Sequence, residues 1–318
     1  MSPLPRSTPT AHRVDSAGIH SFVAALEQAY DVHSYMLVRH GFVVAEGWWP
    51  PGGADVVEEL WSLSKSFTST AVGFANSEGR LALSDRVVDL LPVEVPAIID
   101  DYLARLTVRH LLTMTTGHAA ESLPEDDRAT EPRWAQHVLA APLVFEPGTH
   151  FQYNSGASYL LSAIVQSLTG MTLLDYLQPR LFEPLGIENP TWLSSPQGVN
   201  CGGWGLHART EDIAKFGQLY VQDGIWNGLQ LLPEGWAHEA TSWQVSNGDP
   251  AELGDWTQGY GYQFWQCRHG AYRGDGKLGQ FCIVMPDQDA VLVLTGNVED
   301  MPGELELVWK HVLPALDH

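Results

Sequence analysis

The sequence predicts an α+β fold, in which helices flank an antiparallel sheet and a mostly helical segment is inserted between the two parts of that sheet. Short apolar or aromatic runs with strand character lie near both ends of the chain, and apolar residues at helical spacing fill the middle. This order predicts a discontinuous sheet domain, residues 1–70 and 200–318, and a mostly helical domain, residues 71–199.

The N-terminal part holds the first predicted elements. Residues 16–30 carry apolar side chains at helical spacing, and residues 35–39 and 42–47 have the apolar character of strands. Because His40-Gly41 separates the two runs, we expect a hairpin turn there.

The middle of the chain, up to about residue 191, is predicted to be helical and rich in loops. Residues 60–76 carry apolar side chains at helical spacing, and the helix in this run is predicted to begin at Ser62. Several prolines interrupt the stretch. Further helices are predicted at residues 108–115 with Thr107 as the cap, at 156–168 with Gly170 as the stop, and at 172–181.

The C-terminal part returns to strands. It opens with a predicted helix at residues 210–222, which Thr210 caps. Apolar or aromatic runs bounded by Gly, Pro and Asp then predict strands, and a last helix follows. The strands are expected at residues 261–266, 280–285 and 291–295, and the helix at 304–313.

Charge and composition exclude some classes of function. The chain has 318 residues with 44% hydrophobic residues, and its formal net charge is -21, from 38 acidic and 17 basic residues. Because such an acidic surface repels phosphate backbones and anionic lipids, nucleic-acid and membrane partners are not expected. No apolar run long enough for a membrane span or an export signal is visible, which predicts a cytoplasmic location.

The cysteines and histidines predict no metal site. Cys201, Cys267 and Cys282 form an odd set without a C-x-x-C pair, and no H-E-x-x-H motif occurs. We therefore expect buried free thiols and no cofactor. No Gly-x-Ser-x-Gly motif occurs either, which excludes the common α/β-hydrolase arrangement.

Ser62 and Lys65 form the first candidate catalytic pair. Three residues apart on a helix, their side chains share a face and can meet. A serine hydroxyl becomes a good nucleophile when a base removes its proton, and a neutral lysine is such a base. Taken alone the S-x-x-K pattern is weak, because Ser62 could be a helix cap and Lys65 a solvated lysine.

Two further segments carry candidate site residues. Tyr153 lies directly before the helix predicted at residues 156–168, where it could act as a general base or simply pack. Residues 274–280 are rich in glycine and come before a predicted strand, so their backbone could approach a ligand or form an ordinary turn.

With these three segments the chain resembles the serine β-lactamase-like superfamily. The branch it resembles contains class C β-lactamases, D-alanyl-D-alanine peptidases, esterases and 6-aminohexanoate-dimer hydrolases. The resemblance covers about residues 20 to 315 and implies a β-lactamase-like fold. Residues 108–117, 145–148, 202–219 and 228–236 support it.

The resemblance also implies roles for named residues. Ser62 attacks the carbonyl and becomes acylated, while Lys65 and Tyr153 carry its proton to the leaving group and later activate water. The backbone N–H groups of Ser62 and Lys277 form the oxyanion hole. Asn154, Ser155, Gly274, Asp275 and Gly276 are the candidate substrate-binding residues.

The chain departs from the family pattern at two of these positions. Ser155 stands where the family often has asparagine, and Gly274 stands where it usually has lysine or histidine. The missing cation helps to hold the substrate carboxylate of penicillins and D-alanyl peptides, and Asp275 adds a negative charge beside the gap. Arg273 or His269 could supply a replacement cation.

The resulting prediction is a serine hydrolase of small-molecule esters or amides. A β-lactamase or D-alanyl-D-alanine carboxypeptidase is the first alternative. The second is a penicillin-recognising protein that becomes acylated and does not turn over. The sequence does not predict the acyl group, the leaving group or the oligomeric state.

Overall fold

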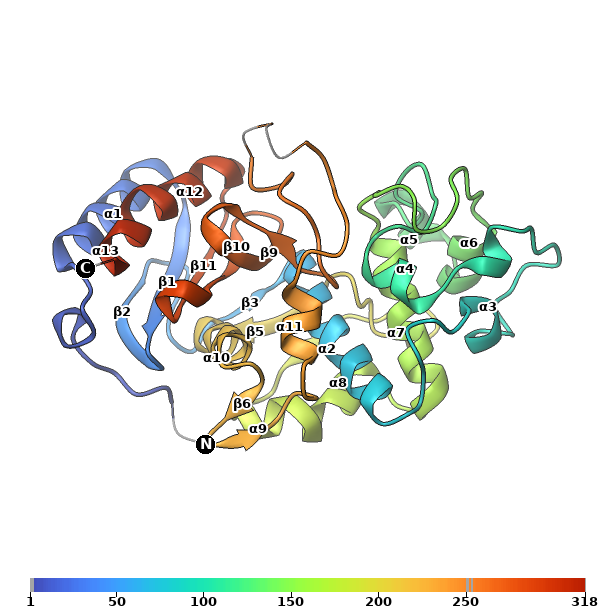
Figure 1. Ribbon diagram of the computed structural model, residues 1–318, viewed down its shortest axis with the longest axis horizontal. Coiled ribbons are helices and arrows are strands. Elements are labelled where there is room, and N and C mark those ends of the chain that lie inside the picture. The colour runs from blue at the N-terminus through green and yellow to red at the C-terminus, as the bar shows by residue number, and fades with distance from the viewer. Residues whose placement is uncertain (1–2, 250–251, 253, 318) are drawn as a thin grey trace.

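A six-stranded antiparallel sheet with helices on both faces forms one side of the molecule (Figure 1). The computed structural model describes residues 3–249, 252 and 254–317. The strands follow the order β2-β1-β11-β10-β9-β8, so the two ends of the chain contribute neighbouring strands. They are β1 Val32–Arg39, β2 Phe42–Trp48, β8 Trp265–Gln266, β9 Tyr272–Gly276, β10 Gln280–Met285 and β11 Ala290–Gly296.

Each face of the sheet packs against its own set of helices. Tyr35 and Leu37 of β1 join a core with the helices of the two chain ends, whereas Met36 and Val38 join the core on the opposite face. This alternation follows from the two-residue period of a strand. The end helices are α1 Ser16–Ala29, α12 Met301–Leu307 and α13 Leu313–Leu316, and α10 Thr210–Val221 covers the other face.

The β1–β2 hairpin has the predicted turn. His40 has φ +52° and Gly41 has φ +79°, the left-handed values of a two-residue turn that matches strand twist. The helix expected at residues 16–30 and the strands expected around this turn are confirmed, with limits shifted by at most a few residues.

The long helix α2, Ser64–Ser77, lies at the centre of the molecule. Its side chains from Ser64 to Ala75 are all buried, and many are serine, threonine, alanine or glycine. Several of the buried hydroxyls find partners: Ser66 Oγ donates to the carbonyl of Gln263 at 2.9 Å, and Thr68 Oγ1 to that of Gly202 at 2.7 Å. Small side chains therefore let neighbouring elements approach α2 closely.

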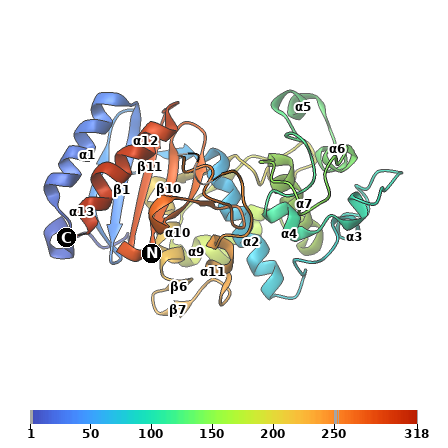
Figure 2. The ribbon, with the colours of Figure 1, turned by 45° about the horizontal axis from the view of Figure 1, so that its top comes forward.

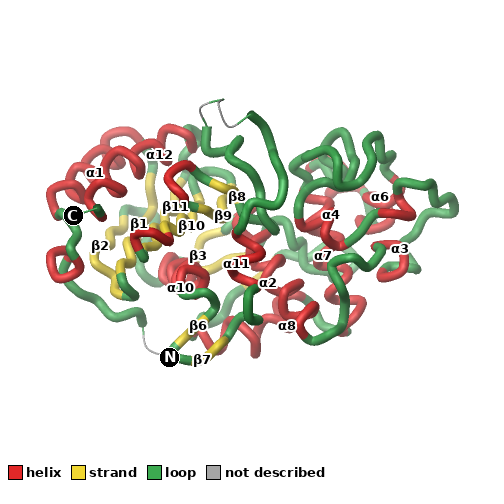
Figure 3. Tube along the Cα trace, in the orientation of Figure 1, coloured by secondary structure: helices red, strands yellow, loops and turns green. Residues whose placement is uncertain are grey.

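Beyond α2 the chain is mostly helical, and α3 to α7 lie apart from the sheet (Figures 2 and 3), whereas α9 contacts α10. The predicted helices at 108–115 and 156–168 are present as α4 and α7, and Gly170 ends α7 in the left-handed conformation. The helices are α3 Val87–Leu90, α4 Val108–Leu112, α5 Glu125–Thr130, α6 Trp134–Ala140, α7 Ser155–Thr169, α8 Leu173–Leu177 and α9 Glu183–Leu185.

Smaller elements complete the fold. A three-stranded sheet lies beside α2, and a short hairpin and one helix follow α10. They are β3 Val57–Glu59, β4 Thr191–Trp192, β5 Leu206–Arg209, β6 Ile225–Trp226, β7 Leu229–Gln230 and α11 Trp236–Thr241.

Several local predictions are corrected. The strand expected at residues 261–266 is only β8, and the helix expected at 172–181 ends as α8 before a π turn. Arg209, not Thr210, is the N-cap of α10, because Asp212 accepts from the backbone N–H of Arg209 and Thr210 is the first helical residue.

The predicted domain limits are not settled by this architecture. Residue 70 falls inside α2, which continues to Ser77, so the division of the chain at residues 70 and 200 stays a prediction. Within the described residues no single helix is long and apolar enough to cross a membrane, although two segments bent by 69°, Ser155–Thr169 and Leu173–Leu185, meet that test together.

Candidate active site

Ser62 lies in a 3-10 turn, Trp61–Leu63, directly before α2, and not in the first turn of the α-helix as predicted. Trp61 has φ +45°, a left-handed value that is uncommon for a bulky residue. Ser62 itself is partly exposed, whereas Leu63 and Ser64 are buried. The turn therefore presents one hydroxyl at the end of a buried helix.

Lys65 is the most unusual residue of α2. Its side chain is 1% exposed, and its Nζ lies 2.9 Å from Ser62 Oγ, 2.7 Å from the carbonyl oxygen of Gly203 and 3.2 Å from Ser155 Oγ. The Ser62–Lys65 contact expected from the three-residue spacing is therefore present.

Burial lowers the pKa of Lys65 to about 7, because the apolar surroundings disfavour the charged form. A neutral amine has two N–H donors and one lone pair. The carbonyl of Gly203 only accepts, and the hydroxyl of Ser155 accepts the second N–H. The lone pair of neutral Lys65 is then left for the O–H of Ser62, which is the arrangement that a general base requires.

A carboxylate supports the other side of the site. Glu121 accepts hydrogen bonds from the backbone N–H groups of Ser155 at 2.7 Å and Gly156 at 3.1 Å, at the start of α7. A helix N-terminus favours an anion. Glu121 thereby holds the residue whose hydroxyl contacts Lys65.

Asn154, predicted to bind substrate, has a structural position instead. Its side chain is 0% exposed, and its Oδ1 accepts from the N–H of Gly156 at 2.9 Å and from the hydroxyl of Ser122 at 2.9 Å. It is the N-cap of α7. Its carboxamide oxygen already accepts hydrogen bonds from within the protein, and the neighbouring Ser155 is the residue whose hydroxyl contacts Lys65.

Tyr153 joins the same group. Its hydroxyl lies close enough to Ser62 to influence the pKa of the phenol, and Lys65 Nζ lies 4.9 Å from the centroid of its ring. The ring stacks on Trp265 of β8 at 5.1 Å. Burial, followed by the nearby charge of Asp275, raises the pKa of Tyr153 well above its usual value. Tyr153 is therefore a neutral phenol, able to donate one proton and accept another.

Residues 274–276 lie in strand β9, so the alternative of an ordinary turn does not hold for them. Gly276 pairs with Gln280 and packs so closely on the turn before Ser62 that a Cβ atom would lie 2.2 Å from the carbonyl oxygen of Leu60. Only glycine fits there. This close approach brings Lys277, the next residue, to the turn that carries Ser62.

Gly274 faces α2. A Cβ atom at this position would lie 2.3 Å from Leu63 Cδ1 and 2.7 Å from Ser66 Oγ. The position is therefore filled by its neighbours, and a lysine or histidine side chain cannot be added without moving them.

The sequence suggested that Asp275 adds an unpaired negative charge to the site, but the structure pairs it with an arginine. Its Oδ2 lies 2.9 Å from Arg273 Nη2 and 3.0 Å from Nε, and both side chains are buried. Arg273 also stacks on Trp256, with Cζ 4.3 Å from the ring centroid. The two charges compensate each other, so neither a free carboxylate nor a free cation faces a substrate from this strand.

His269 does not replace the missing cation. It lies in the turn Arg268–Gly270, and its ring centroid is 5.4 Å from that of Trp309 in the C-terminal helical segment. Of the predicted site residues, the structure brings together Ser62, Lys65, Tyr153, Ser155 and Asp275, with Gly276 holding Lys277 close.

Sequence reasoning missed Gly203 and Glu121. The backbone carbonyl of Gly203 leaves no mark in the sequence beyond the Gly202-Gly203 pair. Glu121 is distant from Ser62 in the chain, and only the fold brings it close.

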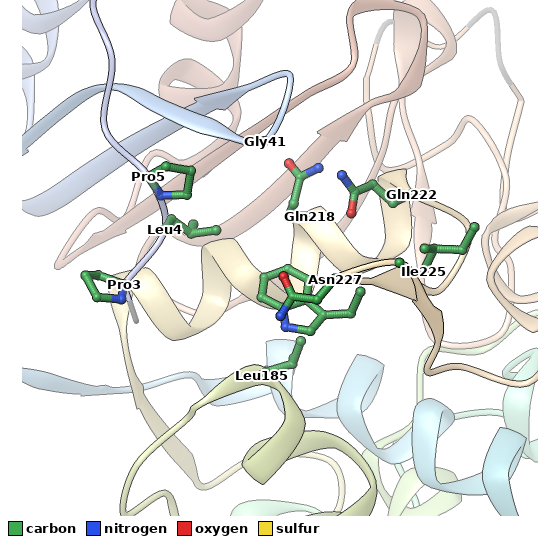
Figure 4. A pocket seen from close by; sticks show the side chains of 11 residues that line it. Pro3, Leu4, Pro5, Gly41, Leu185, Gln218, Gln222, Ile225 and Asn227 are labelled. Carbon is green, nitrogen blue, oxygen red and sulfur yellow. The ribbon is translucent and has the colours of Figure 1, made fainter. Parts of the chain in front are cut away.

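A pocket of about 830 Å³ lies elsewhere, between the N-terminal segment, α10 and the β6–β7 hairpin (Figure 4). Leu4, Gln218 and Trp226 are among the residues that line it, and none of the candidate site residues does.

Comparisons with known proteins agree with this arrangement. A family model described as Beta-lactamase matches residues 21–316. The chain is 26% identical over 201 residues to a lovastatin esterase of Penicillium rubens, covering 55% of this chain and 49% of that protein. It is 26% identical over 303 residues to penicillin-binding protein 4 of Amycolatopsis lactamdurans, covering 80% of this chain and 75% of that protein.

A solved structure shows the same fold. A putative 6-aminohexanoate-dimer hydrolase from Bacillus anthracis superimposes with a TM-score of 0.79 at 19% identity, covering 100% of this chain and 88% of that one. The chain spans about half of the length of the lovastatin esterase that it matches. The predicted fold class, an antiparallel sheet flanked by helices in a β-lactamase-like arrangement, is confirmed.

Proposed function

Since the chain belongs to the β-lactamase family, we propose that it is a serine hydrolase of esters or small amides and works through an acyl-enzyme on Ser62. The observation that carries the proposal is the 2.9 Å contact between Ser62 Oγ and a buried Lys65 whose other partners leave its lone pair for that hydroxyl. This is the pairing of nucleophile and base that acyl transfer needs.

Acylation takes two steps. Lys65 accepts the proton of Ser62 as Oγ forms a bond to the substrate carbonyl carbon, and the carbonyl oxygen becomes an oxyanion. The backbone N–H groups of Ser62 and Lys277 stabilise that charge. When the oxyanion collapses, the bond to the leaving group breaks, and the proton on Lys65 reaches the leaving group through the hydroxyl of Tyr153.

Deacylation repeats these steps with water. A water molecule gives one proton to Lys65 and attacks the acyl carbon, a second oxyanion forms, and its collapse breaks the bond to Oγ. Ser62 regains its proton and the carboxylic acid leaves. Because Tyr153 is a neutral phenol, it accepts one proton as it donates another and carries no net charge.

The proposal is tested directly with a probe that reacts covalently with an active-site serine. A fluorophosphonate should label Ser62 and no other residue, as read by mass spectrometry of the digested protein. A steady rate after the first turnover with p-nitrophenyl butyrate identifies a hydrolase. A burst of product equal to the enzyme concentration and no further release would identify a penicillin-recognising type of protein instead.

The pH profile should follow Lys65. Its folded-state pKa, about 7, lies below its ordinary value because of burial. Neutral Lys65 is the active form, so kcat/KM should rise about tenfold per pH unit below about pH 7 and level off above it. The measurement is p-nitrophenyl butyrate hydrolysis between about pH 5 and about pH 9, corrected for background hydrolysis. A rate that falls as pH rises through this range would contradict Lys65 as the base.

Neutral esters should be preferred over β-lactams. Strand β9 presents no free cation, since Arg273 is buried and paired with Asp275. A carboxylate placed against β9 gives up hydration without a charged partner, so kcat/KM for p-nitrophenyl butyrate should exceed that for nitrocefin by about one to two orders of magnitude. Equal or faster nitrocefin hydrolysis would favour the β-lactamase alternative.

A further inference from the structure

Arg128 of α5 is a cation on the helical side of the candidate site, and the proposed mechanism does not use it. Its guanidinium lies flat on Trp204, with Cζ 3.9 Å from the ring centroid, and its Nε donates to the carbonyl of Leu123 at 2.8 Å. Figure 1 places α5 among the helices and β9 in the sheet. Arg128 and the buried Arg273 of β9 therefore belong to different sides of the molecule.

Both supports of Arg128 are tied to the site residues. Leu123 donates its N–H to Glu121 Oε1 at 2.9 Å, the carboxylate that also binds the start of α7. Trp204 follows Gly203, whose carbonyl accepts from Lys65, and its own carbonyl accepts from Trp192 Nε1 at 2.9 Å. The guanidinium is thus held at a fixed place relative to Lys65.

The two terminal nitrogens of Arg128 remain available. Across residues 3–249, 252 and 254–317, Nε makes the one hydrogen bond of this side chain, and no carboxylate lies within ion-pair distance of it. The side chain is partly exposed. In a protein with 38 acidic residues, a fixed arginine without an acidic partner is uncommon, and its planar fork suits a carboxylate.

The proposed mechanism puts the leaving group near Tyr153, which passes the proton and stacks on Trp265 of the sheet. Arg128 is connected to Lys65 by a different route, through Trp204 and the carbonyl oxygen of Gly203. The proposal below therefore assigns the leaving group to the Tyr153 side and the acyl chain to the Arg128 side.

We propose that Arg128, held over Trp204, determines specificity by binding a carboxylate at the far end of the acyl chain, so that the substrates are monoesters or monoamides of dicarboxylic acids. The proposal rests on the acyl-enzyme function given above. The Trp204 indole holds the guanidinium in place, and the two terminal nitrogens of Arg128 bind the terminal carboxylate by charge-assisted hydrogen bonds.

The test compares two esters that differ in one group. p-Nitrophenyl hexanoate and the mono-p-nitrophenyl ester of adipic acid have the same chain length and leaving group, but only the second ends in a carboxylate. The quantity measured is the ratio of kcat/KM for the adipate ester to that for the hexanoate ester. Arg128→Met should lower this ratio about tenfold, mainly through KM, and Arg128→Lys should lower it less, because it keeps the charge without the fork.

Arg133→Met is the matched control. Arg133 is also an arginine of the helical side, but it is paired with Glu94 at 3.1 Å, so its loss should leave the ratio within about twofold. Arg128→Lys keeps the test decisive if Arg128→Met does not fold, because it retains the positive charge at this partly exposed position and should still lower the ratio.

An unchanged ratio in a folded Arg128→Met variant would overturn the proposal. An equal fall of the ratio in Arg133→Met would also overturn the proposal. The effect would then come from the overall charge of the protein and not from a contact with Arg128. A failure of the acyl-enzyme function is distinguished by Ser62→Ala, which would then keep its activity on both esters.

Discussion

Replacing Ser62 with alanine is expected to lower kcat/KM for p-nitrophenyl butyrate by at least about three orders of magnitude, since the proposed acyl-enzyme forms on the Ser62 hydroxyl. Ser62 is partly exposed, and its hydroxyl contacts Lys65 at 2.9 Å. Its removal leaves no large cavity, so the thermal unfolding midpoint should change little. The measurement is initial rate together with a melting curve on the same preparation.

Ser69 gives a matched control on the same helix. Its hydroxyl is buried and makes no hydrogen bond within the described residues, so Ser69→Ala removes an equivalent atom with no partner at the site. This variant should keep nearly full activity. Activity of Ser62→Ala above about one per cent of the unmodified protein would show that another residue carries the reaction.

The sequence predicted the elements whose signals are local. The His40-Gly41 turn, the helix that ends at Gly170 and the strands of residues 280–285 and 291–295 all follow from hydrophobic period and turn residues, and all are present. Where local signals are weak, tertiary packing decides the structure. The glycines of residues 274–276 left a turn and a closely approaching backbone open, and pairing with β10 makes them part of a strand.

The geometry of the site was predictable in part. The S-x-x-K spacing alone places Ser62 and Lys65 together, and their contact is present. The charge state of the third segment was not predictable, because the pairing of Asp275 with Arg273 depends on Trp256 and the burial of both charges. Because Arg273 compensates the negative charge of Asp275, the argument against β-lactams now rests on the missing cation at Gly274.

The second large effect concerns Lys65 and Tyr153 together. Lys65→Ala and Tyr153→Phe should each lower kcat by about two to four orders of magnitude, because each removes one link of the same proton path. The kcat of the double variant should be no more than about threefold below that of the less active single variant. Once one group of a shared proton path is missing, removing the second has little further effect. The measurement is kcat for p-nitrophenyl butyrate in all four proteins, at a pH above about 7, where Lys65 is neutral.

The two substitutions differ in how much they disturb the folded protein. Tyr153→Phe keeps the ring that stacks on Trp265 at 5.1 Å, so its effect reports the hydroxyl alone. Lys65→Ala removes a buried amine along with its contacts to Gly203 and Ser155, so its folded fraction is measured alongside by circular dichroism. Losses that multiply in the double variant would mean that the two side chains act in separate steps. Tyr153 would then have a role other than relaying the proton that Lys65 takes from Ser62.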